Sequence, residues 1–236
     1  MKAPVAILAA LAALSATTGL AQQQDTTGLG EVLVTGNRDG IPYAQSTRPV
    51  VGLRRRADAA VMLLTIVSDS REEAVRRQEI HSVLLSALDR ANAAGFELVS
   101  GSVQLNRVTK ANYKDLPFQY AGRVDTGRVD VLVKARLEGS AAETKARLQA
   151  FIGSIKGSGR ATVSTGVGMS LTVVNPDQYR DAIVQLVAGD ARHTASLFGP
   201  DFTFNVTGID GQISWSQVSS TEVFLFIPYR YVIIPK

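Results

Sequence analysis

The chain has 236 residues, of which 45% are hydrophobic, and its formal net charge is +4. This length and composition indicate a globular protein of one large or two small domains, not a disordered chain. The charge is too small and too dispersed to indicate a nucleic-acid partner. Cysteine is absent from the sequence, which excludes disulfides, thiol nucleophiles and lipidated cysteines.

The first 21 residues have the form of a cleaved export signal. A charged start precedes an apolar run from Val5 to Leu14, and the small residues Gly19 and Ala21 stand at the positions before a cut. A membrane-spanning helix needs about 20 apolar residues, and polar residues from Thr17 onwards interrupt this run. We expect residues 1–21 to be removed on export, which leaves no membrane span and a net charge of 24 − 21 = +3.

Residues 22–47 are polar and rich in glycine, as expected of a flexible leader that contains one short strand. The segment EVLVTGNR, from Glu31 to Arg38, is similar to the start of the plug region of TonB-dependent outer-membrane receptors. That similarity implies contact with the TonB system. Because the match is short, we interpret the segment as a leader strand that pairs with the body, which is predicted to occupy residues 48–236.

The first half of the body is predicted to contain a buried strand, a capped helix and a second strand. The apolar run from Ala59 to Val67 predicts the buried strand. Ser70 and Glu73 have the spacing of a capping box, which predicts that a long helix begins there. The segment 96–108 predicts the second strand, and 110–127 predicts a hairpin arm or an exposed loop.

The middle of the body alternates strands with a second capped helix. Segment 128–137 alternates strictly between apolar and other residues, as in a sheet strand with one wet face. Ser140 and Glu143 repeat the capping box in front of a helix over 141–155. Segment 161–174 alternates again and predicts another strand.

The last third is predicted to be a helix followed by strands. Asn175 is the predicted helix cap, and a proline follows it at the first helical position. Asp210 and Gly211 predict a hairpin turn, and 221–234 predicts a long central strand. The whole order predicts an α+β fold of mainly antiparallel sheets with three amphipathic helices packed on them.

These elements, in this order, resemble the SIMPL domain family. The helix that runs through Asp190, Ala191 and Arg192 to Leu197 and Gly199 carries the most specific part of the resemblance, which spans residues 50–234. The resemblance implies a bacterial protein exported to the periplasm or outer surface of a Gram-negative cell, without a catalytic centre. It also implies a link to envelope or oxidative stress.

The titratable residues give little basis for an enzyme. His81 lies among apolar helix residues, and Asp190 lies one helical turn before His193 and is placed to orient it. Without cysteine and with two distant histidines, the ligands of a metal site cannot be named. We expect no enzyme activity, cofactor or metal. The alternative is a small-ligand-binding or enzymatic cleft near His193 and Asp190.

Two groups of residues are the predicted binding surfaces. One group comprises Arg54, Arg55 and Arg56. It is predicted either to contact lipid phosphate, whose oxygens match the guanidinium group of arginine, or to form a solvated strand edge. The other offers apolar edge residues for pairing with another molecule, and it comprises Phe224, Phe226 and Tyr229. We expect a non-catalytic binding or scaffold protein that self-associates or contacts another envelope protein.

Overall fold

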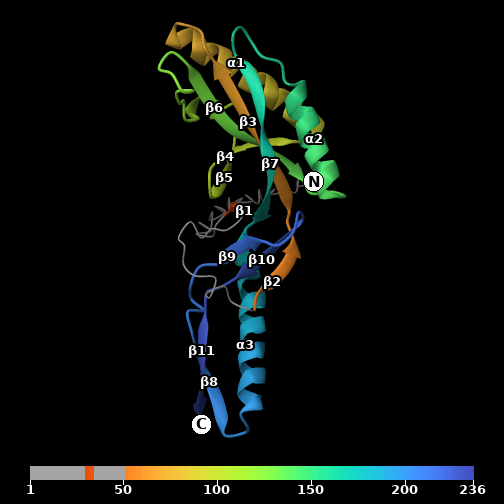
Figure 1. Ribbon diagram of the computed structural model, residues 1–236, viewed down its shortest axis with the longest axis vertical. Coiled ribbons are helices and arrows are strands. Elements are labelled where there is room, and N and C mark those ends of the chain that lie inside the picture. Colours follow the sequence, from red (N-terminus) through yellow and green to blue (C-terminus); the bar gives the residue numbers. More distant parts are fainter. Residues whose placement is uncertain (1–29, 35–50) are drawn as a thin grey trace, which may run out of the picture.

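The computed structural model describes residues 30–34 and 51–236, which form an elongated molecule (Figure 1). A barrel with two helices occupies one end, a three-stranded sheet lies in the middle, and a narrow limb forms the other end. All strand pairs in the described part are antiparallel, so the predicted α+β class is confirmed. The predicted signal and most of the predicted leader lie outside the described residues.

Six strands close into a barrel in the order β1-β5-β4-β6-β3-β7. Their bounds are Glu31–Val34 (β1), Ala59–Ser68 (β3), Glu97–Ser100 (β4), Gln104–Arg107 (β5), Gly127–Arg136 (β6) and Thr162–Val174 (β7). The apolar strand β3 lies between β6 and β7 and pairs with both along most of its length. The strand β1 pairs with β5 and β7, which confirms that the leader contributes a strand to the body.

The barrel wall has two apolar faces of unequal size, because side chains alternate along each strand. On one face, residues such as Met62 and Val131 join the main core beneath α1 (Glu73–Ala94) and α2 (Ala141–Ser154). The other face has a smaller cluster, and Leu132 packs against it. The members of this cluster are Leu33, Val61, Val99 and Leu105. Towards one end of the barrel, this second face carries charged residues, which include Glu31 and Lys134.

The two predicted capping boxes have different outcomes. At α2, the Ser140 hydroxyl accepts a hydrogen bond from the Glu143 amide, and the Glu143 carboxylate accepts one from the Ser140 amide, as predicted. At α1 the cap residue is Glu72 and makes no side-chain cap bond, so the capping box predicted at Ser70 is wrong. The Ser70 hydroxyl instead donates to the Glu79 carboxylate at 2.9 Å, and is thereby lost to the helix cap.

The segment that follows α1 differs from the prediction. The predicted strand over 96–108 is a hairpin of β4 and β5, and Gly101 has a φ of 129° that other residues rarely adopt. Most residues of segment 110–127 are exposed, as the loop alternative predicted, but the segment is also anchored to the body by buried side chains. Tyr113 in the short 3-10 helix η1 (Tyr113–Asp115) is buried, and Phe118 packs against the main core.

The last helix begins later than predicted. Asn175 has a φ of 43°, makes no side-chain cap bond and precedes a 3-10 turn, η2 (Pro176–Tyr179). The helix α3 then runs from Arg180 to Leu197, so the predicted cap at Asn175 is wrong. No helix in the described part of the chain is both long enough and apolar enough to cross a membrane.

The predicted final strand over 221–234 is two strands in different sheets. Pro228 separates β10 (Glu222–Phe226) from β11 (Arg230–Pro235), because proline has no amide hydrogen for a sheet ladder. β10 is the central strand between β2 (Leu53–Arg56) and β9 (Ser214–Gln217), and β11 pairs with β8 (Phe202–Thr207). The hairpin predicted at Asp210 and Gly211 is therefore wrong, since the strands on either side pair elsewhere.

Candidate functional site

The predicted arginine triplet lies on β2, at the edge of the three-stranded sheet. Arg54 and Arg56 are exposed, and Arg56 donates to the carbonyl of Gly139. Arg55 points to the other face of the strand, where its guanidinium forms an ion pair with Asp58 at 2.5 Å. The structure therefore does not bring the three guanidinium groups together on one surface.

The predicted aromatic residues are not at a sheet edge. Phe224 and Phe226 lie on the central strand β10, with ring centroids 5.6 Å apart, and Phe224 is buried. Their predicted placement at an edge is wrong, because β10 pairs with β2 on one side and with β9 on the other. Tyr229 is half-buried beside Tyr231, and burial raises its pKa, with smaller contributions from Asp190 and Tyr231.

The residues of the alternative site, Asp190 and His193, lie on α3 in the limb. The hydroxyl of Tyr231 donates to Asp190 at 3.2 Å and is 3.0 Å from the hydroxyl of Thr194. His193 is exposed, and its backbone carbonyl accepts a hydrogen bond from Ser196. Asp190 is thus placed with Tyr231, and no hydrogen bond joins it to His193 in the described part of the molecule.

Sequence reasoning missed a polar cleft of about 720 Å³ at one end of the barrel. Residues of β1, β4, β5 and β6 line it, together with the start of β3 and the turn η2. The charged residues that the strands contribute are on the barrel face that carries the smaller apolar cluster, and they comprise Glu31, Glu97, Arg107, Lys134 and Arg136. These residues come from distant parts of the sequence, and no motif connects them.

Lys134 is the central charge of this cleft. Its ammonium group lies 2.5 Å from Glu31 and 2.7 Å from Glu97, and its side chain is only 18% exposed. The hydroxyl of Thr172 donates to the second oxygen of Glu31 at 2.6 Å. Burial lowers the pKa of Lys134, but its hydrogen bonds to the two glutamates outweigh burial and raise that pKa overall. The same hydrogen bond lowers the pKa of Glu97, against the opposing effect of burial.

The opposite wall of the cleft contains Asp58 and Tyr179. Asp58 is paired with Arg55 and also accepts a hydrogen bond from the amide of Val174 at 2.9 Å. Arg55 lies over the Tyr179 ring at 4.5 Å and donates to the Tyr179 hydroxyl. Tyr179 lines the cleft, and its hydroxyl proton has no acceptor among the described residues, so this hydroxyl keeps a hydrogen bond to donate.

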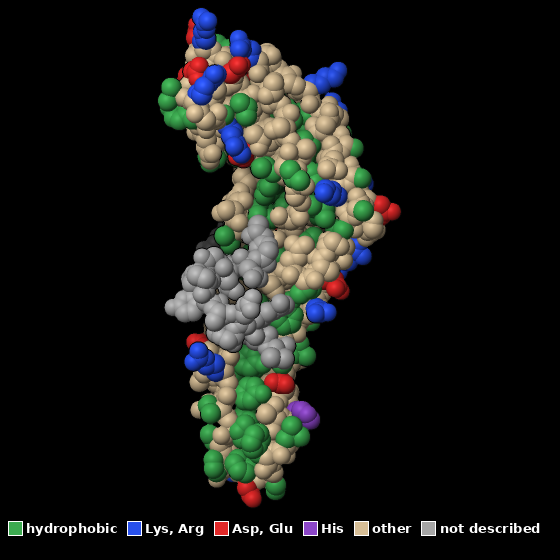
Figure 2. Space-filling model, viewed as in Figure 1, with side chains coloured by type: hydrophobic (Ala, Val, Ile, Leu, Met, Phe, Trp, Pro, Cys, Tyr) green, Lys and Arg blue, Asp and Glu red, His purple; other side chains and the backbone are tan. Residues whose placement is uncertain are grey.

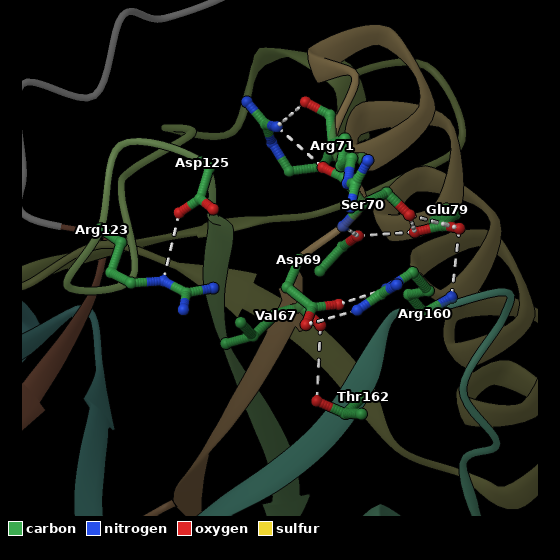
Figure 3. A network of polar contacts seen from close by, with 11 residues as sticks. Val67, Asp69, Ser70, Arg71, Glu79, Arg123, Asp125, Arg160 and Thr162 are labelled. Carbon is green, nitrogen blue, oxygen red and sulfur yellow. Dashed lines mark hydrogen bonds and ion pairs between the residues drawn. The ribbon is translucent and has the colours of Figure 1, made fainter.

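A second polar network lies at the other end of β3 (Figure 3). Arg160 donates to both carboxylate oxygens of Asp69, at 2.7 and 2.9 Å, and its amide donates to Glu79. Glu79 also accepts from the hydroxyls of Ser68 and Ser70. Arg160 lowers the pKa of Asp69, and chiefly the Ser68 bond lowers that of Glu79. This network joins α1 to β3 and to the start of β7, which gives it a structural role.

The C-terminal limb, defined as α3, β8 and β11, exposes many apolar side chains (Figure 2). Leu197 is 72% exposed and Val232 is 61% exposed. Every residue of β8 and β11 is at least partly exposed, although the helix α3 packs on this ribbon. The other exposed apolar residues of the limb include Leu186, Phe198, Phe202 and Ile234.

The limb also has unpaired strand edges. β8 and β11 pair only with each other in the described part of the chain, so each keeps one free edge. A groove of about 250 Å³ lies between α3 and β8, and its apolar walls include Val184, Val187 and Phe204. An apolar groove beside a free strand edge is a surface on which another polypeptide can add a strand.

Comparisons with known proteins do not assign the chain to a family. No protein-family model matches it, and no curated protein matches it. The similarity to the SIMPL domain family therefore stays a prediction from the residues. In the described part of the molecule, no three histidine or acidic side chains are grouped as metal ligands would be.

Proposed function

We propose that this is a SIMPL-like protein of the bacterial envelope with a non-catalytic scaffold role, and that it self-associates through the C-terminal limb. The observation that carries the proposal is the set of exposed apolar side chains on a limb of one helix and two strands. Export to the periplasm or outer surface is supported by the signal-like form of residues 1–21. The link to envelope or oxidative stress rests on the family resemblance.

A limb of this construction gains stability from a partner. An isolated two-stranded ribbon is marginally stable in water, and one helix buries only part of one face. In α3 just four residues are buried, namely Ile183, Val187, Ala191 and Ala195. Covering the remaining apolar surface would contribute about 25 cal/mol for each Å² removed from water.

A second copy of the chain suits this surface. Two limbs related by a twofold axis would pair one free edge with its equivalent, and thereby form a four-stranded antiparallel sheet. Both α3 helices would then lie on one face of that sheet, which is a common two-layer arrangement. The 18 residues of α3 span about 27 Å, which sets the length of the surface available to such an interface.

The test of this proposal is the molar mass of the exported protein in solution. Size-exclusion chromatography with light scattering at micromolar concentration should give a mass of at least two chains. A second measurement, crosslinking followed by mass spectrometry, should place the contacts within residues 180–207 and 230–236. Crosslinks confined to the barrel would contradict the assignment to the limb.

A further inference from the structure

We infer that the polar cleft at the end of the barrel binds a small organic oxyanion, a carboxylate or a phosphate monoester. This inference is independent of self-association, because the cleft belongs to the barrel and not to the limb. Its volume of about 720 Å³ is within the range of pockets that hold small molecules. The chemical class of the ligand follows from which groups in the cleft are already paired.

The carboxylates of the cleft are all occupied by donors. Glu31 accepts from Lys134 and Thr172, and Glu97 accepts from Lys134. Asp58 is held by Arg55 through both of its oxygens and by a backbone amide. A cationic ligand would have to displace these internal donors, and would leave them unpaired in a partly buried site.

The donors of the cleft, in contrast, are not all occupied. The Arg136 guanidinium has no hydrogen-bond or ion-pair partner among the described residues. Arg107 has only a long contact with Glu97, at 3.9 Å, and the Tyr179 hydroxyl keeps a proton to donate. Arginine binds the oxygens of a carboxylate or phosphate through two parallel hydrogen bonds, and a hydroxyl can donate to the same oxygens, so donors of these kinds favour an oxyanion.

The balance of charge agrees with this inference. Counting Arg55, which pairs with Asp58, the described residues at the cleft comprise four cations and three carboxylates, a net charge of 4 − 3 = +1. Arg136 is the cation that forms no ion pair among the described residues. The rings of Phe96 and Tyr179 also line the cleft, and they give an organic ligand an apolar surface to contact.

Four probes with the same ring separate the ligand classes: benzoate, phenyl phosphate, the neutral benzamide and the cationic benzamidine. Binding is measured by titration calorimetry and by protein NMR on the chain as purified after export, in a chloride buffer free of other oxyanions. We expect benzoate or phenyl phosphate to bind with about millimolar or better affinity, and benzamide and benzamidine to bind at least about tenfold more weakly. The tighter of the two anions identifies the headgroup.

Variants locate the site. Arg136→Gln should weaken binding of the preferred anion about tenfold or more, because a charge-assisted hydrogen bond is lost. Arg192→Gln, at an exposed arginine of α3, is the matched control and should bind as the wild type does. Circular dichroism verifies that both variants are folded. Equal or tighter binding of benzamidine, no binding of either anion, or unchanged anion binding by folded Arg136→Gln would each overturn the inference.

Discussion

Replacing Lys134 with methionine removes the central charge of the cleft while keeping most of the side-chain length. The side chains of Lys134 and Glu31 are 18% and 12% exposed, so both charges are largely removed from water. Without the ammonium group, Glu31 and Glu97 remain as carboxylates without their main partner. Removing one member of a buried pair costs about 3–5 kcal/mol, and the 37% exposure of Glu97 favours the lower end, about 3 kcal/mol.

Urea unfolding followed by tryptophan fluorescence measures this loss. Trp215 is the single tryptophan of the sequence, is 3% exposed and donates to the carbonyl of Leu33 at 3.2 Å, so its emission should change on unfolding. The triple variant Lys134→Met/Glu31→Gln/Glu97→Gln should recover most of the loss, because no unpaired charge remains. If Lys134→Met lowers the free energy of unfolding by less than about 0.5 kcal/mol, the claim that Lys134 forms a largely buried ion pair is wrong, because so small a loss is typical of a solvated surface pair.

The pH dependence gives a second readout with a definite sign. In the wild type, the pKa of Glu97 is below its ordinary value of 4.5. Ionised Glu97 therefore stabilises the fold above pH 4.5, and this stabilisation is lost as the pH falls through the pKa of the folded state. In Lys134→Met, the lowering hydrogen bond is gone and burial raises the pKa of Glu97 instead. The stability difference between wild type and variant should therefore narrow from pH 7 to pH 5.

Four further substitutions test the capping, glycine and ion-pair arguments. Ser140→Ala should lower the free energy of unfolding by about 1 kcal/mol in urea titrations, since it removes the cap of α2. Gly101→Ala should cost about 2 kcal/mol or more, because its φ is 129° and a Cβ would lie 1.9 Å from a backbone oxygen, whereas Gly153→Ala within α2 should stabilise by about 0.5–1 kcal/mol. Arg160 lowers the pKa of Asp69, so ionised Asp69 stabilises the fold, and this stabilisation is lost as the pH falls through the pKa of the folded state. Asp69→Asn should therefore show a smaller loss of stability than the wild type when acid unfolding is followed below about pH 4.

Several strands and helices of the barrel were predictable from the sequence because their signals are local, whereas the closure of the sheet into a barrel was not predicted. The alternating pattern of 128–137 gave the correct buried face of β6, and the cap at Ser140 gave the correct start of α2. The C-terminal strands were not predictable in the same way. Asp210 and Gly211 are turn residues, but strand pairing depends on Pro228, which redirects the chain after β10.

The cleft could not be found from one sequence. Lys134 and Glu31 are separated by 103 positions, and an isolated lysine on the wet face of a strand is typical of a solvated surface. The pair is buried only because β1, from the predicted leader, closes the barrel beside β5 and β7. Two of the residues predicted to form binding surfaces are instead used inside the molecule, since Phe224 is buried and Arg55 is paired with Asp58.

The molar mass of the exported protein, wild type and Val232→Asp, is the most direct test of association through the limb. Val232 is 61% exposed on β11, so aspartate there should leave the fold intact but place like charges near each other across a twofold interface. Val167→Asp on β7, 90% exposed and on the barrel, is the matched control. Light scattering should show at least two chains for the wild type and Val167→Asp, and one chain for Val232→Asp. A monomeric wild type at micromolar concentration, or an unchanged mass for folded Val232→Asp, would contradict the account.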